Sequence, residues 1–397
     1  MNTKTRHARS TLAKQGCFSI WKELKRRARA LIWGCFSLLA LNTHAQSAAS
    51  GEIVLGQSAA LSGPAAQVAV DFNLGASLYF DEVNQRGGIN GRKVRLRSLD
   101  DGYDVARTVA NTKRLVEEEK VLALFGYVGS APSEAGAAAA IQAGVPFLAP
   151  VTGTESLRVF NRYVFNVRAS HYDETWAIVR HLTTTGLTRI AAFYEAGENN
   201  KGGLAGLERA LAQRDLSLAG KGVLDPDGIN ASSAVRSVSK ANPQAVVMFA
   251  AYPGTVAFVR DMLASGSSAS LWTVSFVGSQ VLADELADEG RGIQVSQVVP
   301  FPWDTNIPLV REYQKALAPT KEQPGFGSLE GYIAARVAVE GLKKAGPSVT
   351  RESFIKGLES LQRLDLGGFT IAFTPSEHNG SHFVDLTMIT RKGRFIR

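Results

Sequence analysis

The chain has 397 residues, with 44 Lys and Arg against 36 Asp and Glu, and a formal net charge of +8. Nine of the basic residues and only one acid, Glu23, lie in the first 29 positions, so the remainder of the chain is balanced in charge. Nucleic acids and anionic membranes require clustered Lys and Arg on the folded part of a protein. The charge distribution therefore excludes both as partners of the mature chain.

The N-terminal segment has the pattern of an export signal. Its basic region runs into an apolar stretch at 30–41, about 12 residues long, whereas a membrane-spanning helix needs roughly 20. Thr43 and Ala45 supply small residues where a signal peptidase reads the chain. We predict a signal peptide at 1–45 and a mature protein in the periplasm, with a retained N-terminal anchor as the alternative.

Both cysteines, Cys17 and Cys35, lie inside this segment. The mature chain is therefore expected to contain no disulfide, no thiol nucleophile and no cysteine-ligated metal. Lipidation at Cys35 is disfavoured because Trp33 stands where a small residue is required and the apolar run continues past the cysteine. A mature length near 350 residues predicts two domains.

From residue 51 onward, short β-rich runs alternate with longer amphipathic segments, which is the pattern of βα units. In the first part we predict strands at 53–58, 93–99, 122–125 and 146–148 and helices at 73–85, 104–118 and 133–143. A second cycle follows 163–168, with strands at 189–193, 220–224, 245–249, 271–276 and 293–299 and helices at 172–184, 203–214, 230–241, 253–264 and 281–289. Further helices are expected at 308–317, 329–344 and 351–361, and paired strands at 368–396 with a turn at Asn379-Gly380.

Strands that helices bury on both faces form parallel, doubly wound sheets, and the repeated pattern predicts two of them. The predicted fold class is α/β, with two lobes joined by three crossovers. The first lobe is assigned 46–168 and 300–365, and the second lobe 169–299 and 366–397. The stiff segment 300–303 suits the second crossover, and the third is expected near Asp365.

Two loops that lead from a strand into a helix are candidates for anion binding. The loop at 126–133 has glycines for close backbone approach and Ser130 near the start of a helix, and the loop at 150–155 contributes Thr152 and Thr154. Helix N-termini offer free N–H groups and a favourable field to a carboxylate. Plain N-capping explains the same residues without a ligand.

These loops, in their order and spacing, resemble the branched-chain amino acid-binding family of periplasmic solute receptors. The similar stretches are 60–64, 87–92, 100–103, 126–133, 150–155, 165–170 and 297–300. The resemblance implies a type I periplasmic binding protein fold, the Venus-flytrap architecture, with a ligand held between the lobes. It also implies that the ligand's carboxylate rests on the first-lobe loops.

The positions that match the family's ligand contacts are our candidate site. They are Ser130, Tyr127, Val151, Thr152 and Gly153 on the two loops, Val68 in place of an aromatic after Gly63-Pro64, and Tyr252, which closes from the second lobe.

Two second-lobe positions depart from the family pattern. Asn199 or Asn200 replaces an aromatic, and Gln280 stands near the place of the acid that pairs with an ammonium group. Because an unpaired buried ammonium costs several kcal/mol, Asp101, Glu195 or Glu198 are alternative sources of that charge. The ligand is therefore left open as an amino acid, an amide, or an aromatic or aliphatic carboxylate.

The sequence gives little support for an enzymatic function. No nucleophile elbow, phosphate loop or zinc-binding histidine spacing is present, and we expect no cofactor and no metal. His378 and His382 flank a predicted turn and are expected at the surface, and Asp100-Asp101 is read as a loop with one solvated carboxylate.

The chain is thus predicted to be the extracytoplasmic solute-binding component of an ABC transporter. Its expected partners are a small-molecule ligand and an ABC permease in the inner membrane, and the protein is expected to be a monomer. The alternatives are a sensing module that reports ligand closure to a membrane receptor or regulator, and a hydrolase on the same scaffold.

Overall fold

The computed structural model describes residues 51–63, 65–196, 198–224 and 230–397, with the side chains of 198–201 left out. The predicted signal peptide lies outside these residues. Within them, no helix combines the length and apolar character needed to cross a membrane.

The first sheet has five parallel strands in the order β2-β1-β3-β4-β5. They are β1 (Ile53–Ala59), β2 (Val94–Asp100), β3 (Ala123–Phe125), β4 (Phe147–Leu148) and β5 (Val164–Phe165). Consecutive residues of β3 enter different cores: Leu124 packs with α3 (Val105–Glu117) and α4 (Ser130–Ala143), and Phe125 packs with α2 (Ala66–Gln85) and α11 (Phe326–Lys344). Helices therefore cover both faces of the sheet, as the doubly wound prediction requires.

The second sheet has the order β14-β13-β10-β9-β8-β6-β7. Five of its strands are parallel, namely β6 (Ile190–Glu195), β7 (Lys221–Leu224), β8 (Ala245–Phe249), β9 (Ser270–Thr273) and β10 (Gln294–Gln297). Two antiparallel strands, β13 (Asp385–Ile389) and β14 (Phe395–Ile396), extend one edge.

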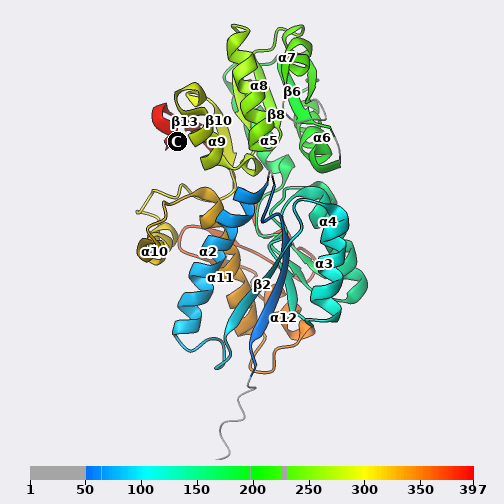
Figure 1. Cartoon of the computed structure of the whole chain (residues 1–397), viewed down its shortest axis with the longest axis vertical. Helices are drawn as coiled ribbons and strands as arrows, with labels where there is room; N and C mark the ends of the chain where they lie inside the picture. The colour runs from blue at the N-terminus through cyan, green and yellow to red at the C-terminus, as the bar shows by residue number, and fades with distance from the viewer. Residues whose placement is uncertain (1–50, 64, 197, 225–229) are drawn as a thin grey trace, which may run out of the picture. The chain divides into compact units, whose positions relative to one another are not determined.

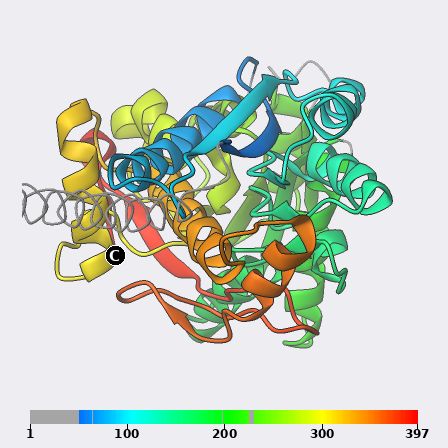
Figure 2. The same cartoon turned by 90° about the horizontal axis from the view of Figure 1, so that it is seen from below.

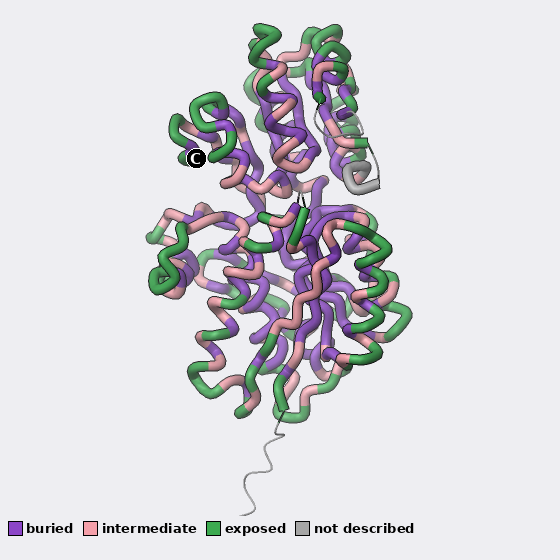
Figure 3. The backbone as a smooth tube through the Cα atoms, in the orientation of Figure 1, coloured by how far each residue is buried: buried purple, intermediate pink, exposed green. Residues whose placement is uncertain are grey.

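Helices also cover both faces of this second sheet. Val247 of β8 packs with α5 (His171–Thr184) and α6 (Glu198–Ala212), whereas Val246 packs with α7 (Ser232–Ser239), α8 (Tyr252–Ala264) and α9 (Ser279–Leu286). Figure 1 shows the two groups of helices around their strands, and Figure 3 shows the buried residues gathered along the strands and the inner faces of the helices. We call the parts built on the first and second sheets the first and second lobes.

Most predicted elements are confirmed, including α10 (Pro308–Leu317) and β8 at the expected residues. Four helices begin three or more residues earlier than predicted, at Ala66, Ser130, Glu198 and Phe326. For α2 the reason is that Ala69, Phe72 and Ala76 continue a buried stripe at helical spacing ahead of the predicted start.

The predicted hairpin with its turn at Asn379-Gly380 is wrong. The strand β12 (Thr370–Ile371) pairs instead with β11 (Leu364–Asp365), and the Gly380 N–H donates to Asn166 O of the first lobe at 2.8 Å. The imidazole of His378 stacks on Phe165 of β5, with ring centroids 3.8 Å apart. These contacts hold the chain on the first lobe, so the third crossover falls after Gly380 and not near Asp365.

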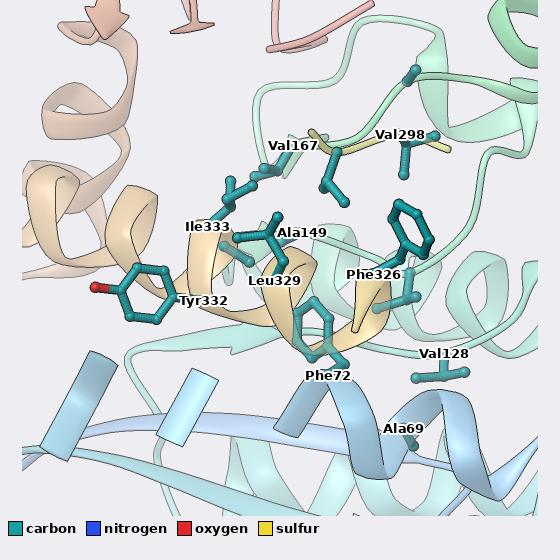
Figure 4. Packing of buried hydrophobic residues seen from close by; sticks show 14 of the residues in the cluster. Ala69, Phe72, Val128, Ala149, Val167, Val298, Phe326, Leu329, Tyr332 and Ile333 are labelled. Carbon is teal, nitrogen blue, oxygen red and sulfur yellow. The ribbon is translucent and has the colours of Figure 1, made fainter. Parts of the chain in front are cut away.

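Helices α2 and α11 pack unusually closely within the first lobe (Figure 2). A Cβ atom added at Gly331 would lie 1.9 Å from Phe72 O, and one added at Gly75 would lie 1.7 Å from Ser328 O. The backbones meet because both positions lack a side chain. Figure 4 shows Phe72 of α2 beside Leu329 of α11, with Val167 and Val298 of the first two crossover segments nearby.

Candidate functional site

Ser130 and Thr152 form a pair of hydroxyls where β3 and β4 end. Ser130 is the first residue of α4, entered through Gly129 at φ 91°, and its Oγ lies 2.8 Å from Thr152 Oγ1. Both side chains are buried, with residue exposures of 5% and 1%. The pair therefore offers hydroxyl donors next to the N-terminus of a 14-residue helix, a setting that favours an anion.

The rest of the second loop brings the two lobes together. The Gly153 carbonyl accepts from the His171 N–H at 2.7 Å, at the start of α5. A Cβ atom at Gly153 would lie 2.5 Å from that nitrogen, so only glycine permits this approach. Val151 is buried, and its N–H donates to Tyr127 O at 2.7 Å.

The side chain of Tyr127, one of the predicted ligand contacts, lines neither of the two cavities described below. Its side chain is fully buried beneath α4, packed on Phe147, and its hydroxyl shares a 2.9 Å hydrogen bond with Thr112. Burial raises the pKa of this phenol, which keeps it neutral. Because side chains alternate along an extended segment, Tyr127 points into the core behind the sheet.

Two cavities lie between the lobes. The Ser130 cavity comprises about 280 Å³ of space not filled by atoms, part of it open solvent, and is lined by Ser130, His171, Gly203, Phe249, Ala250, Val274 and Phe276. The Glu330 cavity comprises about 530 Å³ of space not filled by atoms, part of it open solvent, and is lined by Val68, Asp71, Phe72, Val151, Arg168, Ser275, Phe276, Gly278, Ser279, Gln280, Gln297, Val298, Val299, Phe326, Gly327 and Glu330. Phe276 lines both, so the cavities adjoin.

The predicted residues divide between these cavities. Ser130 lines the smaller one, while Val68, Val151 and Gln280 meet in the larger one, where Gln280 Nε2 donates to Asp284 Oδ1 at 2.8 Å. Tyr252 begins α8 and packs against the core without lining either cavity. The side chain of Asn200, in the first turn of α6, lies outside the described residues.

A buried charged network beside the Glu330 cavity was missed by the sequence reasoning. The guanidinium of Arg168 lies 3.5 Å from Glu174 Oε1 and 3.3 Å from Glu330 Oε1, and it donates to Ser275 Oγ. Glu174 also accepts from the Ser275 N–H at 2.8 Å and from Ser296 Oγ at 2.7 Å. The sequence signal for this network was Arg168 itself, the one charged residue of the 165–170 stretch, three residues after the end of β5.

This network is incompletely satisfied. Arg168 Nε, Glu174 Oε1 and His171 Nδ1 are buried without a hydrogen-bond partner. Burial would raise the pKa of Glu174, but contacts with His171 and Arg168 lower it below its usual value. Burial raises the pKa of Glu330, and the charge of Glu174 adds to that rise. The two glutamates thus compete for one guanidinium.

Asp101, an expected alternative source of negative charge, does not line either cavity. It is fully buried and accepts from Ser58 Oγ at 2.7 Å and Thr108 Oγ1 at 3.1 Å. Its neighbour Asp100 keeps about a third of its side chain exposed. Burial acts to raise the pKa of Asp100, but hydrogen bonds from Ser62 and two backbone N–H groups lower that pKa to about 2. This pair anchors the loop around Gly102 and provides no paired acid and base.

Of the two C-terminal histidines predicted at the surface, His382 lies there and His378 does not. His378 is 2% exposed, and burial lowers its pKa, whereas the side chain of His382 is 69% exposed. Among the described residues, no group of three or more His, Cys, Asp and Glu is placed to hold a metal ion.

Comparisons with known proteins agree with this architecture. The family model described as periplasmic binding protein matches residues 52–394. The structure of a possible leucine/isoleucine/valine-binding protein from Rhodopirellula baltica is 31% identical with a TM-score of 0.81, covering 87% of this chain and 96% of that one. A substrate-binding periplasmic protein from Ralstonia solanacearum is 32% identical with a TM-score of 0.79, covering 87% and 99%.

A curated relative is also named as a Leu/Ile/Val-binding protein. Leu/Ile/Val-binding protein homolog 7 of Brucella abortus is 25% identical over 334 residues, which are 77% of this chain and 82% of the relative. The fold, the two interlobe cavities and these similarities agree with the resemblance found in the sequence. The chain belongs to the periplasmic binding protein family, with the type I fold of its branched-chain amino acid-binding members.

Proposed function

We propose that this protein is the extracytoplasmic solute-binding component of an ABC transporter and that it binds a small carboxylate between its lobes. The observation that carries this proposal is the buried Ser130–Thr152 hydroxyl pair at the N-terminus of α4, beside an interlobe cavity. The proposed setting is the periplasm, with a monomer that delivers its ligand to a permease in the inner membrane.

The chemistry of the pair suits a carboxylate. In this structure the two hydroxyls bond to each other, and Thr152 Oγ1 also accepts from the Thr154 N–H at 3.2 Å, so the Ser130 hydroxyl can turn toward an anion while Thr152 keeps its contact with Thr154. Hydrogen bonds to a charged group contribute about 1.5–3 kcal/mol each, and the field of the helix adds to them. A dissociation constant near 1 μM, about −8 kcal/mol, fits a receptor that must later release its ligand.

The lobes lie close enough around the site to enclose a ligand. A Cβ at Gly278 of the second lobe would lie 3.6 Å from Val68 Cγ2 of the first, and one at Gly202 would lie 3.3 Å from Thr154 Oγ1. We propose that ligand binding favours this closed arrangement and that the permease distinguishes it from an open one. A ligand shifts such an equilibrium only by its different affinities for the two states.

Thermal unfolding of the mature protein against a panel of carboxylates tests the proposal. A micromolar ligand at millimolar concentration should stabilise the protein by roughly 4 kcal/mol. Ser130→Ala should weaken binding about 10-fold or more, measured by calorimetry, because one donor to the anion is lost.

Ser133→Ala is the matched control, since Ser133 is also buried on α4 but bonds to Tyr127 O and lines neither cavity. It should leave ligand affinity unchanged. Recovery of chemically altered ligand would favour a hydrolase, and well-folded protein that responds to no carboxylate would overturn the assignment.

A further inference from the structure

Four aromatic side chains gather where the second crossover meets both lobes, and we call them the crossover cluster. They are Phe301 and Trp303 of the crossover, Phe326 at the start of α11, and Phe395 of β14. The Trp303 ring lies nearly parallel to that of Phe395, with centroids 6.0 Å apart. The Phe326 ring stands edge-on to both, at 5.4 Å from each. Phe326 and Phe395 are buried, so the cluster is packed around them.

The rings of the crossover cluster are fixed to different lobes. The crossover residues are held on the first lobe, because Gln314 of α10 donates from Nε2 to Pro302 O at 2.7 Å and α10 packs on α2. Phe395 is held on the second lobe by the pairing of β14 with β13, where it lies opposite Ile389. The contacts of Phe395 with the other rings therefore cross the boundary between the lobes.

An ion pair crosses the same boundary beside the cluster. Arg397 lies 5.3 Å from the centroid of the Phe301 ring, and its Nη2 lies 2.7 Å from Asp304 Oδ2 at the first-lobe end of the crossover. Its Nε lies 3.6 Å from Asp385 Oδ2 in β13, a contact within the second lobe. The two aspartate side chains are equally exposed, at 27%. One guanidinium thus has one acidic partner in each lobe.

The cluster and the ion pair stand apart from the proposed ligand contacts. Phe326 lines the Glu330 cavity, whereas Trp303, Phe395 and Arg397 line neither cavity. Their contacts across the boundary therefore favour the present arrangement of the lobes whether or not a ligand is bound. Separating the lobes would break these contacts and expose ring surface to water, which is unfavourable.

We propose that the crossover cluster and the Arg397–Asp304 pair form a lock that holds the lobes in the closed arrangement through contacts that no ligand makes. The lock sets the ratio of open to closed protein before any ligand binds. It therefore scales the affinity for every ligand of the closed form by the same factor and leaves the preference among ligands unchanged.

Distances between spin labels on the mature protein measure this ratio without a ligand. Because Cys17 and Cys35 both lie in the predicted signal peptide, Lys113→Cys in the first lobe and Leu263→Cys in the second provide the only attachment sites. Both native residues are exposed, with 71% of the Lys113 side chain and 48% of Leu263 accessible. Pulsed electron resonance then resolves open and closed protein as two populations of label distance.

Phe395→Ala should raise the ratio of open to closed protein about 10-fold or more, because it removes the ring contacts with Trp303 and Phe326. Ile396→Ala is the matched control. Ile396 is the next residue of β14, its side chain points to the opposite side of the strand, and it is 44% exposed. This control should leave the ratio unchanged.

A second pair of variants tests the ion pair and serves if Phe395→Ala proves unfolded in thermal unfolding. Asp304→Asn should raise the ratio about 1.5- to 5-fold, because a partly exposed pair across the boundary is lost. Asp385→Asn removes the same charge from the partner within the second lobe. It should leave the ratio unchanged or lower it, since Arg397 is then free to pair with Asp304 alone.

The lock is overturned if wild-type protein shows only the open distance, or if the ratio fails to rise in Phe395→Ala and Asp304→Asn relative to their controls. Equal increases in Asp304→Asn and Asp385→Asn would show that total charge, and not the contact across the boundary, is responsible. Because no ligand enters the measurement, failure of the lock leaves the proposed function standing, and failure of every carboxylate to bind leaves the lock standing.

Discussion

At the scale of single residues, the stability of this protein depends on buried charges that are only partly paired. Glu174 is completely buried and links Arg168 to the backbone of Ser275 and the hydroxyl of Ser296. Removing one member of such a network leaves the others without a partner in a poorly solvated place, which costs more than the pair itself contributes.

Glu174→Ala should therefore lower the free energy of unfolding by about 3–5 kcal/mol, measured by chemical denaturation. The control is Glu289→Ala, which removes an exposed partner of Arg260 and should change stability by less than about 1 kcal/mol. Equal losses in the two variants would contradict the assigned role of Glu174.

The residues of the candidate site could be predicted only where their neighbours in the sequence determine their position. Ser130 and Thr152 lie in loops that follow apolar strands, so neighbouring residues alone predict their place at the carboxyl edge of the first sheet. The contact of Arg168 with Glu330 joins segments far apart in the chain, and nothing near Glu330 distinguishes it from a solvated helix face. Tyr127 was misplaced because its neighbours do not show which side of the sheet it occupies.

At the scale of secondary-structure elements, the crossing of α2 and α11 positions one wall of the cleft. Gly331→Ala would place a methyl group 1.9 Å from Phe72 O in the rigid backbone of α2. Although alanine favours helix more than glycine by about 1 kcal/mol, the helices must separate, and we expect a net loss of roughly 1–3 kcal/mol in thermal unfolding.

Gly341→Ala offers a graded comparison on the same helix. Its nearest obstruction is Leu358 Cδ2, the end of a flexible side chain, at 2.6 Å. This variant should lose less stability than Gly331→Ala, and the reverse order would show that the α2–α11 contact is not the tighter one.

At the scale of the whole molecule, the lobes are connected by crossovers whose side chains make their own contacts. In the third crossover, His382 Nδ1 lies 3.2 Å from both carboxylate oxygens of Asp173, which caps α5. The hydrogen bond with Asp173 raises the pKa of His382. Its stabilising contribution is therefore present below the unfolded value of about 6.5 and is lost as the pH rises through the raised folded value.

His382→Asn should accordingly reduce stability more at pH 5.5 than at pH 9, by less than about 1 kcal/mol because the pair is partly exposed. Denaturation curves at the two values measure this. A loss independent of pH would mean that the imidazole acts through packing and not through its charge.

The sequence pattern predicted the architecture of the whole molecule except for its last connection between the lobes. Alternating βα units and two cycles of strands were visible in the sequence, and both sheets are confirmed. The path of 366–380 was not, because it depends on the Gly380–Asn166 hydrogen bond and the stacking of His378 on Phe165, which no local pattern encodes.

The interleaved order of the segments also has a consequence for how the chain folds as it emerges from the ribosome or the export machinery. The apolar face of α2 receives its cover only when α11 arrives, after the five parallel strands of the second sheet have already been made. Until then the N-terminal part of the chain exposes an apolar surface that is prone to self-association. Slowing the delivery of the C-terminal third should therefore increase aggregation far more than an equal delay near the beginning.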